Sequence, residues 1–409
     1  MPKTIAITPS WYWPAGTTRV TGIPPFYLHE MLVERFARHR PGQAALVSGS
    51  ERLTGAELDD TVRRAGAAIV ARAGEGATAV VSAGATLEGV VLVLAALGAG
   101  ARVTMVDPAS GAVTAATPPA GAANGSGDGI VLADATAAAA LGGSALRLGD
   151  LLGDGAAPAP PPATAIGLGD AAVAVATGSG GAFAWHSHRS LLAMAVSIAT
   201  FYRVDASVPW VSDLPLSTWA GLASVATALV AGATVVLAGS EPLPQAIARE
   251  GARYACTDLD SAAALTRDAK RDVKNVRGLL AMLLLAVPGA FDPDQRRRVG
   301  RSFDCPALTV HGNAETGPDF ASHPSWYLDE SVGIPITNAH VVPVDPRSGT
   351  PIQTLWELVE LARVTVGSPA NMVGYDAASG LADPVVDGRV TTSTIASSDA
   401  NGMIYLMPD

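Results

Sequence analysis

The chain has 409 residues, of which 49% are hydrophobic and 16% are charged, so it is long and apolar enough to bury a large core. This composition excludes a disordered protein and a coiled coil. The net charge is −10, and a nucleic-acid or anionic-membrane surface would need clustered basic residues. We therefore expect small molecules or proteins as partners. The lysines are few and confined to Lys3, Lys270 and Lys274.

The two cysteines, Cys256 and Cys305, form neither a disulfide framework nor a CxxC motif, and we expect buried, inert thiols and no metal site. The start, MPKTIAITPSWYWPAG, lacks the apolar core of a secretion signal. Residues 219–239 are uncharged over a length that would span a membrane, but Gly221 and Gly232 favour a helix, a turn and a buried strand. We expect a cytoplasmic protein without a membrane partner.

The first half of the chain alternates helical periods with apolar runs. Residues 1–25 form an aromatic, proline-rich arm, and the apolar period over Phe26–Phe36 predicts a helix. A second helical period begins at Leu53 and is followed by ATAVVSAG and GVVLVLAALGAGARVTMVDP, which we interpret as buried strands. This alternation is typical of an α/β fold with largely parallel strands.

The second half returns to this rhythm after an Ala/Gly/Pro-rich connector at 109–168. Strands are predicted in AAVAVATGSGG, VPWVSDLPLS, ATVVLAG, GLLAMLLLAVPG and CPALTVHG. Beyond about residue 325, short strands between turn signals indicate a small antiparallel barrel or sheet. We therefore divide the chain into the arm, an α/β core at 26–325 and a small β subdomain at 326–409.

Eight short sequence motifs follow one another along the chain, and their order can be compared with that of known families. They are RLTGAELD (52–59), ATGSGGAFAWHSHRSLL (176–192), LPLSTWAGL (214–222), HGNAET (311–316), VGIPITNAHVVPVD (332–345), WELVEL (356–361), NMVGYD (371–376) and DGRVTTSTIASSDANGMIYL (387–406). Their order resembles the large N-terminal domain of the adenylate-forming superfamily, which includes acyl-CoA synthetases and adenylation domains of peptide synthetases. The resemblance implies two helix-flanked, mostly parallel sheets with a small C-terminal β-barrel-like subdomain. We expect the mobile C-terminal domain of that family to be absent.

In this family a carboxylate attacks the α-phosphate of ATP, and a thiol or amine opens the resulting acyl adenylate. The resemblance implies ATP and Mg²⁺ as cofactors, but the residues that would contact them are largely replaced here. The phosphate loop corresponds to Thr177, Gly178, Ser179, Gly180 and Gly181, which are all small residues. Residues 182–184 then read AFA where the family has proline, lysine and glycine, so the family's lysine is missing. We interpret this run either as a vestigial phosphate loop or as a plain β–α turn.

The other nucleotide contacts of the family are changed as well. The ribose-binding aspartate is replaced within Thr392–Ser393–Thr394, which leaves Thr392 and Thr394 as a vestigial ribose site. His311 stands for the family's tyrosine, and Glu315 keeps the position of a Mg²⁺-binding glutamate. A neutral hydroxyl replaces a charged acceptor only weakly, so we expect no resident cofactor.

An acyl pocket can persist where the nucleotide site is lost. The resemblance places its wall at Trp185, Ser217, Thr218, Trp219, Met282, Val287, Pro288, His311 and Gly312. For any single one of these residues, core packing is the favoured alternative. The catalytic candidates are His311 and Glu315, followed by His186 and His188. Because His186 and His188 alternate, a strand would project them on one face, and Asp213 or Glu315 would complete an acid–base set. A structural role for these two histidines is the alternative.

Three hypotheses follow. In the first, a repurposed member of the superfamily binds an acyl or aryl carboxylate or its thioester, on CoA or on the phosphopantetheine of an acyl carrier protein, without ATP. It would then carry out acyl-thioester chemistry, for example in specialised metabolism. The second is an ATP-dependent acid–thiol ligase completed by a separate C-terminal domain. The third is a non-catalytic partner of a biosynthetic enzyme.

Overall fold

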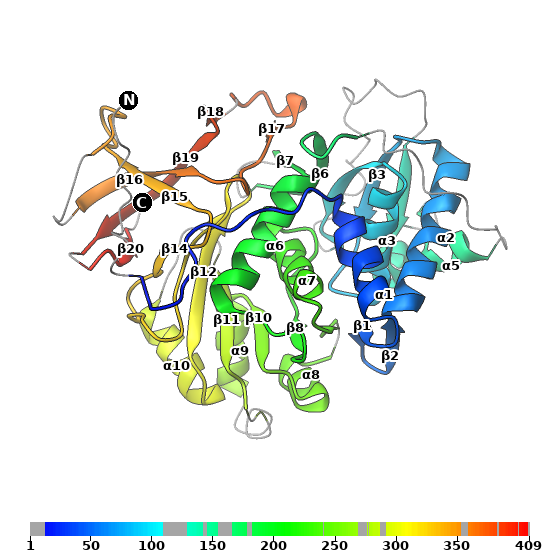
Figure 1. Ribbon diagram of the computed structural model, residues 1–409, viewed down its shortest axis with the longest axis horizontal. Helices are drawn as coiled ribbons and strands as arrows, with labels where there is room; N and C mark the ends of the chain where they lie inside the picture. Colours follow the sequence, from blue (N-terminus) through cyan, green and yellow to red (C-terminus); the bar gives the residue numbers. More distant parts are fainter. Residues whose placement is uncertain are drawn as a thin grey trace.

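The computed structural model describes residues 13–108, 129–141, 145–153, 166–177, 182–239, 241–268, 276, 278–286, 292–352, 359–382, 384–399 and 401–407. Two large sheets and their helices form the core, and a five-stranded antiparallel sheet lies at one end (Figure 1). The predicted fold class, two helix-flanked and mostly parallel sheets with a small C-terminal β unit, is confirmed.

The nine-stranded sheet has the order β14-β13-β12-β11-β10-β8-β9-β1-β2 and is parallel from β12 to β1. Its strands are β1 (Ala44–Ser48), β2 (Glu51–Thr54), β8 (Trp210–Ser212), β9 (Val235–Leu237), β10 (Tyr254–Thr257), β11 (Ala281–Ala286), β12 (Ala307–Asn313), β13 (Gly317–Ala321) and β14 (Ile334–Pro335). Helices α8 (Leu243–Glu250), α9 (Leu259–Asp268) and α10 (Pro293–Phe303) cover one face. Side chains of β11 point alternately to the two faces of the sheet: Met282 and Leu284 pack beneath these helices, while Leu283 and Leu285 face the main core.

The six-stranded sheet has the order β17-β7-β6-β4-β3-β5. Its strands are β3 (Thr78–Ser82), β4 (Arg102–Val106), β5 (Ile130–Ala133), β6 (Ala171–Ala176), β7 (Phe183–Ser187) and β17 (Gly374–Tyr375). The remaining helices are η2 (Glu30–Glu34, a π-helical segment), α1 (Arg35–His39), α2 (Gly55–Ala73), α3 (Leu87–Gly98), α4 (Ala135–Ala140), α5 (Leu148–Leu152), α6 (His188–Tyr202) and α7 (Trp219–Ala231). Side chains of α3, α6 and α7 join both sheets in one core cluster.

The strand interpretation of residues 89–98 was wrong, because this stretch belongs to α3. The Thr86 hydroxyl caps α3 by accepting a hydrogen bond from the Gly89 N–H at 3.0 Å. Every residue of α3 from Val90 to Leu97 is buried, so the sequence shows no polar face that would reveal a helical period. The helix, turn and strand predicted for residues 219–239 are confirmed as α7, Gly232 and β9. Among the described helices, none is long and apolar enough to cross a membrane.

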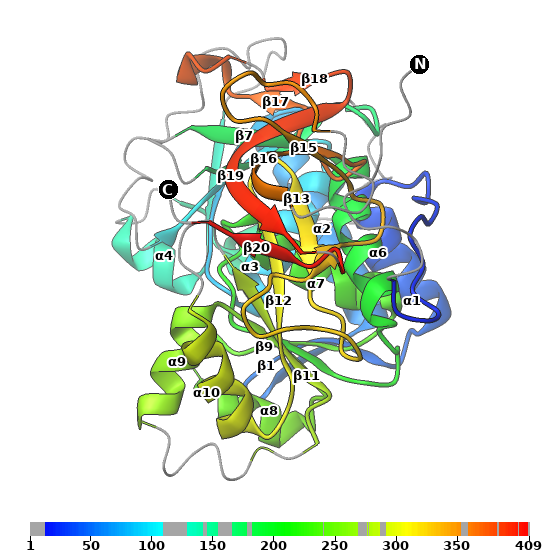
Figure 2. The same ribbon diagram turned by 90° about the vertical axis from the view of Figure 1, so that its left-hand side faces the viewer.

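The five-stranded sheet contains β15 (His340–Val344), β16 (Val359–Gly367), β18 (Val385–Val386), β19 (Arg389–Ser398) and β20 (Ile404–Leu406), and η6 (Ala377–Ser379) precedes β18. It packs on β13, because Phe320 shares a buried cluster with Val364, Val366 and Ile404. Figure 2 shows β19 and β20 in front of β12 and β13. Two strands beyond residue 326, β14 and β17, are edge strands of the two large sheets.

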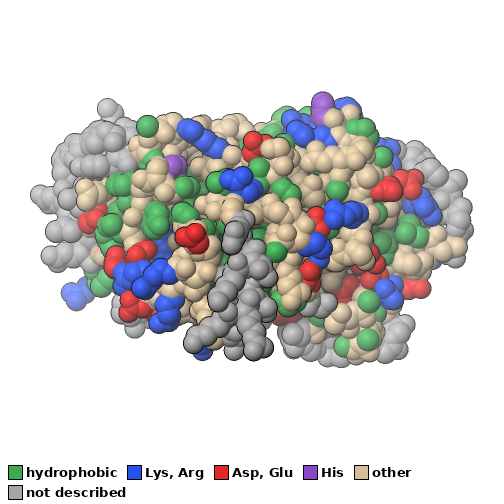
Figure 3. Space-filling model, turned by 90° about the horizontal axis from the view of Figure 1, so that it is seen from below, with side chains coloured by type: hydrophobic (Ala, Val, Ile, Leu, Met, Phe, Trp, Pro, Cys, Tyr) green, Lys and Arg blue, Asp and Glu red, His purple; other side chains and the backbone are tan. Residues whose placement is uncertain are grey.

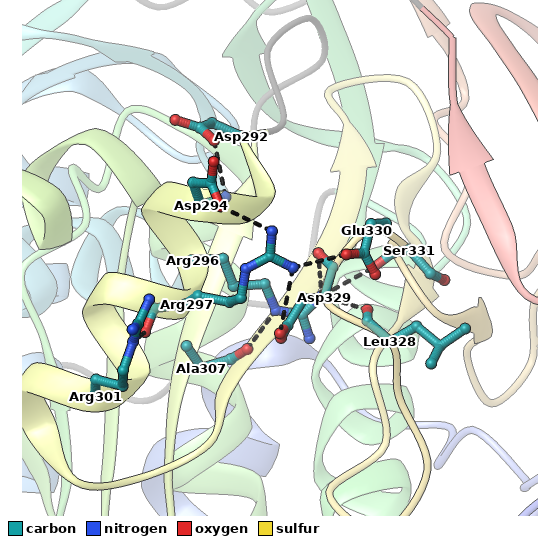
Figure 4. Close-up of polar contacts among 10 residues, drawn as sticks. All are labelled: Asp292, Asp294, Arg296, Arg297, Arg301, Ala307, Leu328, Asp329, Glu330 and Ser331. Atoms are coloured by element: carbon teal, nitrogen blue, oxygen red, sulfur yellow. Dashed lines mark hydrogen bonds and ion pairs between the residues drawn. The ribbon is translucent and has the colours of Figure 1, made fainter.

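Arg296 of α10 holds the α/β core to the segment that leads into this sheet (Figure 4). Its guanidinium is fully buried and donates hydrogen bonds to acceptors on β12, on the end of β13 and on the loop before β14. These acceptors are the carbonyls of Ala307 (2.6 Å), Leu328 (3.0 Å), Asp329 (3.3 Å) and Ser331 (2.9 Å) and the hydroxyl of Ser322 (3.0 Å). The guanidinium also stacks on Tyr327 at 4.9 Å. One planar fork with five donors therefore fixes three segments at once.

The surface arginines of α10 behave differently. Arg297 pairs with Asp294 at 2.8 Å and with Glu330 at 2.6 Å; both carboxylates are exposed, and Arg297 is partly exposed. On the face drawn in Figure 3, basic and acidic side chains are interspersed. Such exposed pairs contribute little to stability.

Arg296→Leu is expected to lower the free energy of unfolding by about 3 kcal/mol or more, because it leaves several buried carbonyls without donors. Urea denaturation measures the change. Arg298→Leu, whose guanidinium is 3.9 Å from Asp292 on the surface, is the matched control and should change it by less than about 0.5 kcal/mol. Equal effects of the two substitutions would show that Arg296 does not hold these segments.

Candidate functional site

The hairpin between β12 and β13 carries the densest set of buried polar groups near the motif HGNAET. The Asn313 Oδ1 accepts hydrogen bonds from the Glu315 N–H (2.9 Å) and from the N–H and hydroxyl of Thr316 (2.8 and 3.0 Å). A Cβ on Gly312 would lie 2.0 Å from the Gly317 carbonyl oxygen, so only glycine fits where the two strands approach. The register shifts between His311 and Gly312 at this point.

His311 and Asp319 form a buried pair across this hairpin. The His311 Nδ1 is 2.7 Å from the Asp319 Oδ1, and both side chains are 0% exposed. Because a carboxylate accepts hydrogen bonds, the His311 Nδ1 carries the proton of this hydrogen bond. Within the described part of the chain, His311 Nε2 and Asp319 Oδ2 have no hydrogen-bond partner. The pair therefore leaves two buried polar atoms without a described partner.

His186 reaches the same hairpin from β7 in the other large sheet. Its Nε2 is 2.7 Å from the Ala314 carbonyl oxygen, so this nitrogen donates, and its Nδ1 is 3.3 Å from the Ser190 hydroxyl. Burial lowers the pKa of His186 to about 4. The ring is therefore neutral near pH 7 and links the two sheets.

The expectation that His186 and His188 share a strand face was wrong. Strand β7 ends at Ser187, whose hydroxyl caps α6 by accepting from the Ser190 N–H at 3.0 Å, and His188 is the first residue of that helix. His188 Nδ1 accepts from the Leu28 N–H at 3.2 Å. Burial, followed by nearby His29, lowers the pKa of His188 to about 4. His188 thus holds the N-terminal helix and lies away from His186.

Glu315 is held by residues that follow the β subdomain's second strand. The Tyr375 hydroxyl donates to Glu315 Oε1 at 3.0 Å, and the Met372 N–H donates to the Glu315 carbonyl at 2.7 Å. Neither Glu315 nor Asp213 bonds to a described histidine. The proposed acid–base set of these carboxylates with the histidines therefore does not form among the described residues.

Asp213 follows β8 and lies three strands from β12, about 14 Å away at the usual strand spacing. Its Oδ2 accepts from the Thr257 hydroxyl at 3.1 Å, while Oδ1 has no partner in the described residues. Burial raises the pKa of Asp213 to about 6, and the Thr257 hydrogen bond opposes this shift.

The phosphate-loop motif lies between β6 and β7, which are antiparallel, so the alternative of a plain β–α turn was wrong. The N–H and hydroxyl of Thr177 both donate to the Ala182 carbonyl, at 2.9 and 3.0 Å. These bonds close the base of the loop, and Gly178–Gly181 lie outside the described residues.

The two threonines of the expected ribose site lie in an irregular part of β19. Between the pairs Arg363–Ile395 and Thr365–Thr391 the register with β16 shifts, and the Thr392 hydroxyl donates to the Val364 carbonyl at 2.9 Å. The Thr394 hydroxyl is buried without a partner in the described residues. Thr392 is therefore engaged by its own sheet.

The residues expected to form an acyl pocket are spread over several elements. Trp185 is half-buried on β7 beside Gly374 of β17, whereas Met282, Ser217 and Trp219 are buried. The Thr218 hydroxyl caps α7 by accepting from the Gly221 N–H at 3.1 Å. Val287 and Pro288 lie outside the described residues. Trp219 belongs to the main core cluster.

The cysteines are buried, as expected. Burial raises the pKa of Cys305 to about 11 and raises that of Cys256 further, which leaves both as thiols. Among the described residues, no three His, Cys, Asp or Glu side chains gather closely enough to hold a metal ion.

Sequence reasoning missed Asp319 and Tyr375, the partners of the two leading candidates. The signal for Asp319 was a single acid in the apolar strand GPDFA, which directly follows a histidine-bearing strand. A lone acid in a buried strand needs a partner, and the preceding strand is the nearest source.

The two mixed sheets, the attached antiparallel sheet and the polar hairpin between them define the large domain of an adenylate-forming enzyme. The sequence matches the family described as AMP-binding enzyme over residues 33–117 and 184–376, more than half of the chain, and the protein belongs to this family. A comparison with curated protein sequences found no match.

Several solved structures share the fold. VinN is 20% identical with a TM-score of 0.78, and the match covers 94% of this chain and 99% of that one. O-succinylbenzoate Coenzyme A synthetase (MenE) from Bacillus subtilis in complex with AMP is 18% identical with a TM-score of 0.75, over 93% of this chain and 78% of that one. The nonribosomal peptide synthetase FmoA3 bound to AMPPNP is 22% identical with a TM-score of 0.79, over 97% and 44%. At these identities the likeness establishes the fold alone.

Asp213→Asn is expected to stabilise the protein at pH 7.5 by about 2–3 kcal/mol, because the folded carboxyl titrates near pH 6 and its ionised form is poorly solvated. Because the pKa of Asp213 is raised in the folded state, the wild type loses stability relative to the variant as the pH rises from about 4 to about 6. The difference should therefore vanish near pH 4.

Urea denaturation at pH 4.5, 6 and 7.5 tests this prediction, since acid effects on other groups cancel between wild type and variant. Asp60→Asn is the matched control: this exposed carboxylate is 3.5 Å from Arg64 and should give a small difference at all three pH values. A pH-independent effect of Asp213→Asn would show that the Asp213 carboxyl titrates normally.

Proposed function

We propose that the protein binds an acyl or aryl carboxylate, or its thioester on CoA or an acyl carrier protein, and acts on it without ATP. The observation that carries this proposal is the buried His311–Asp319 pair with its free Nε2. His311 occupies the motif position where the family resemblance expects a tyrosine. AMP-binding enzymes and relatives such as the CoA synthetase MenE support a carboxylate as the ligand class.

The groups expected to contact ATP fit it poorly. The Thr177 hydroxyl donates to the Ala182 carbonyl across its loop, and the Thr392 hydroxyl donates to the Val364 carbonyl of the neighbouring strand β16. No carboxylate stands at the ribose position. Position 183 carries phenylalanine where the family's phosphate-loop lysine is expected. Each charged contact of this kind contributes about 1.5–3 kcal/mol, so their combined replacement is large compared with ordinary nucleotide affinity. We therefore derive no step through ATP or Mg²⁺.

The His311–Asp319 pair has the geometry of a general base. Asp319 fixes the tautomer through Nδ1 and would stabilise the imidazolium, while Nε2 accepts a proton. With a thioester as substrate, water attacks the carbonyl carbon as its proton passes to Nε2. The C–S bond then breaks, and the departing sulfur takes that proton. An acceptor hydroxyl or amine in place of water gives acyl transfer by the same route.

A second candidate function is favoured by Glu315. It retains the family position for a Mg²⁺-binding carboxylate and is held there by the Tyr375 hydroxyl. This is consistent with an ATP-dependent acid–thiol ligase that a separate C-terminal domain completes. Such a ligase would bind ATP before the partner is added.

Calorimetry with ATP·Mg²⁺ and AMP separates the two functions. We expect no binding tighter than about 1 mM, because the charged contacts are missing. Micromolar ATP binding, or pyrophosphate exchange after addition of a stand-alone C-terminal domain, would establish the ligase instead.

His311→Gln is expected to lower hydrolysis of octanoyl-CoA or benzoyl-CoA by at least 100-fold, the usual contribution of a general base. Asp319→Asn keeps an acceptor for Nδ1 and should lower the rate less. Thiol release measures both rates, and thermal melting verifies folding. The exposed His39→Gln is the control and should retain full activity. Unchanged rates in both site variants would remove His311 from the mechanism.

A further inference from the structure

A hollow of about 380 Å³ lies between the N-terminal segment 13–23 and the core. Its walls come from this segment, from the first turn of α6, from the connection between β14 and β15, and from Pro369. It is distinct from the His311–Asp319 pair and shares no lining residue with it.

Hydrogen bonds fix the wall that the N-terminal segment provides. The Asn338 Oδ1 accepts from the Thr21 N–H at 2.9 Å, and the Asn338 N–H donates to the Arg19 carbonyl at 2.8 Å. The Asn338 side-chain amide also donates to the Ser197 hydroxyl of α6 at 3.2 Å. The Thr337 hydroxyl donates to the Thr18 carbonyl at 2.7 Å. The hollow is therefore a built feature of the fold.

The hollow is positively charged within an acidic protein. Arg19 and Arg189 line it, and among the described lining residues none is Asp or Glu, although the whole chain has a net charge of −10. The Arg19 guanidinium stacks on Trp13 at 5.4 Å, and neither guanidinium has an ion pair within the described ranges. Arg189 lies in the first turn of α6, where the helix dipole disfavours a cation. The position of Arg189 is therefore unfavourable for the stability of the helix, whereas a bound anion at this place would be attracted both by Arg189 and by the helix dipole.

Two walls of the hollow continue directly into the candidate site. Arg189 follows His186 by three residues, and Pro369 precedes Met372, the donor to the Glu315 carbonyl, by three. Arg189 lies in the first turn of helix α6, directly after the strand that carries His186, and Pro369 lies in the turn that leads to Met372. The walls of the hollow are therefore formed by segments that also contact the β12–β13 hairpin.

We propose that this hollow binds the phosphate end of a phosphopantetheine arm, with Arg19 and Arg189 on the phosphate and Trp13 and Ile23 against the chain. Guanidinium groups match phosphate oxygens in charge and geometry, and the remaining lining is mainly apolar. The inference rests on the proposed function, since a thioester substrate needs a thiol carrier. Free CoA and a carrier protein present this same phosphate-bearing arm.

Calorimetry with 4′-phosphopantetheine, pantetheine and CoA tests the assignment. We expect 4′-phosphopantetheine to bind at least tenfold more tightly than pantetheine, which lacks the phosphate. Arg19→Gln and Arg189→Gln should each weaken its binding about tenfold, as expected for loss of one charge-assisted hydrogen bond. CoA that binds more tightly than 4′-phosphopantetheine identifies free CoA as the source, and equal affinities identify a carrier-bound arm.

The exposed Arg38→Gln makes the same charge change away from the hollow and should bind like the wild type. Equal binding of pantetheine and 4′-phosphopantetheine, or arginine variants that bind like this control, would overturn the assignment. His311→Gln should leave phosphopantetheine binding unchanged. If the wild type binds phosphopantetheine but shows no thioesterase activity, or also binds ATP, the proposed function fails while this site stands. If it is active but does not bind phosphopantetheine, this site fails while the proposed function stands.

Discussion

The turn that joins β12 to β13 is the constraint on which the rest of the site depends. Strands from all three sheets are tied to it or packed against it. His186 of the six-stranded sheet donates to the Ala314 carbonyl, Met372 donates to the Glu315 carbonyl, and Phe320 packs under the five-stranded sheet. Because Gly312 allows the two backbones to approach, these contacts converge within a few residues. A rigid junction of this kind can hold a buried polar pair that isolated strands could not.

Burial has opposite consequences for the ionisable groups around this junction. Burial lowers the pKa of His186 and of His188 to about 4, so both rings are neutral near pH 7, and the hydrogen bond of His186 to the Ala314 carbonyl opposes this shift. Asp319 has His311 as a hydrogen-bonded partner, whereas Asp213 has only the Thr257 hydroxyl. Some buried polar atoms, Nε2 of His311 among them, have no hydrogen-bond partner in the described residues. Because burying such an atom is costly, its presence is better explained by a role in binding or catalysis than by stability.

Much of the fold could be predicted because it depends on local patterns. The apolar runs that contain β6, β8, β9, β11 and β12 are short and bounded by turn residues, and the helix at 55–73 begins with a Thr54–Glu57 capping box. The site depends on non-local contacts. Asp319 meets His311 only through a bulged hairpin, and Ser187 separates His186 from His188 by starting a helix. No periodicity in the sequence encodes either arrangement.

The contacts of Asn338 also constrain the order in which the molecule is completed. They join the N-terminal segment to a residue 317 positions later in the chain, with strands β1 to β14 made in between. Contacts between residues so far apart in sequence form late, because the chain entropy lost on closing the long loop is compensated only once the contacts are made. During synthesis from the ribosome, residues 19–21 therefore wait for Asn338 before this wall of the hollow is fixed. The hollow is in this sense assembled only after the strands of the two large sheets up to β14 have been made.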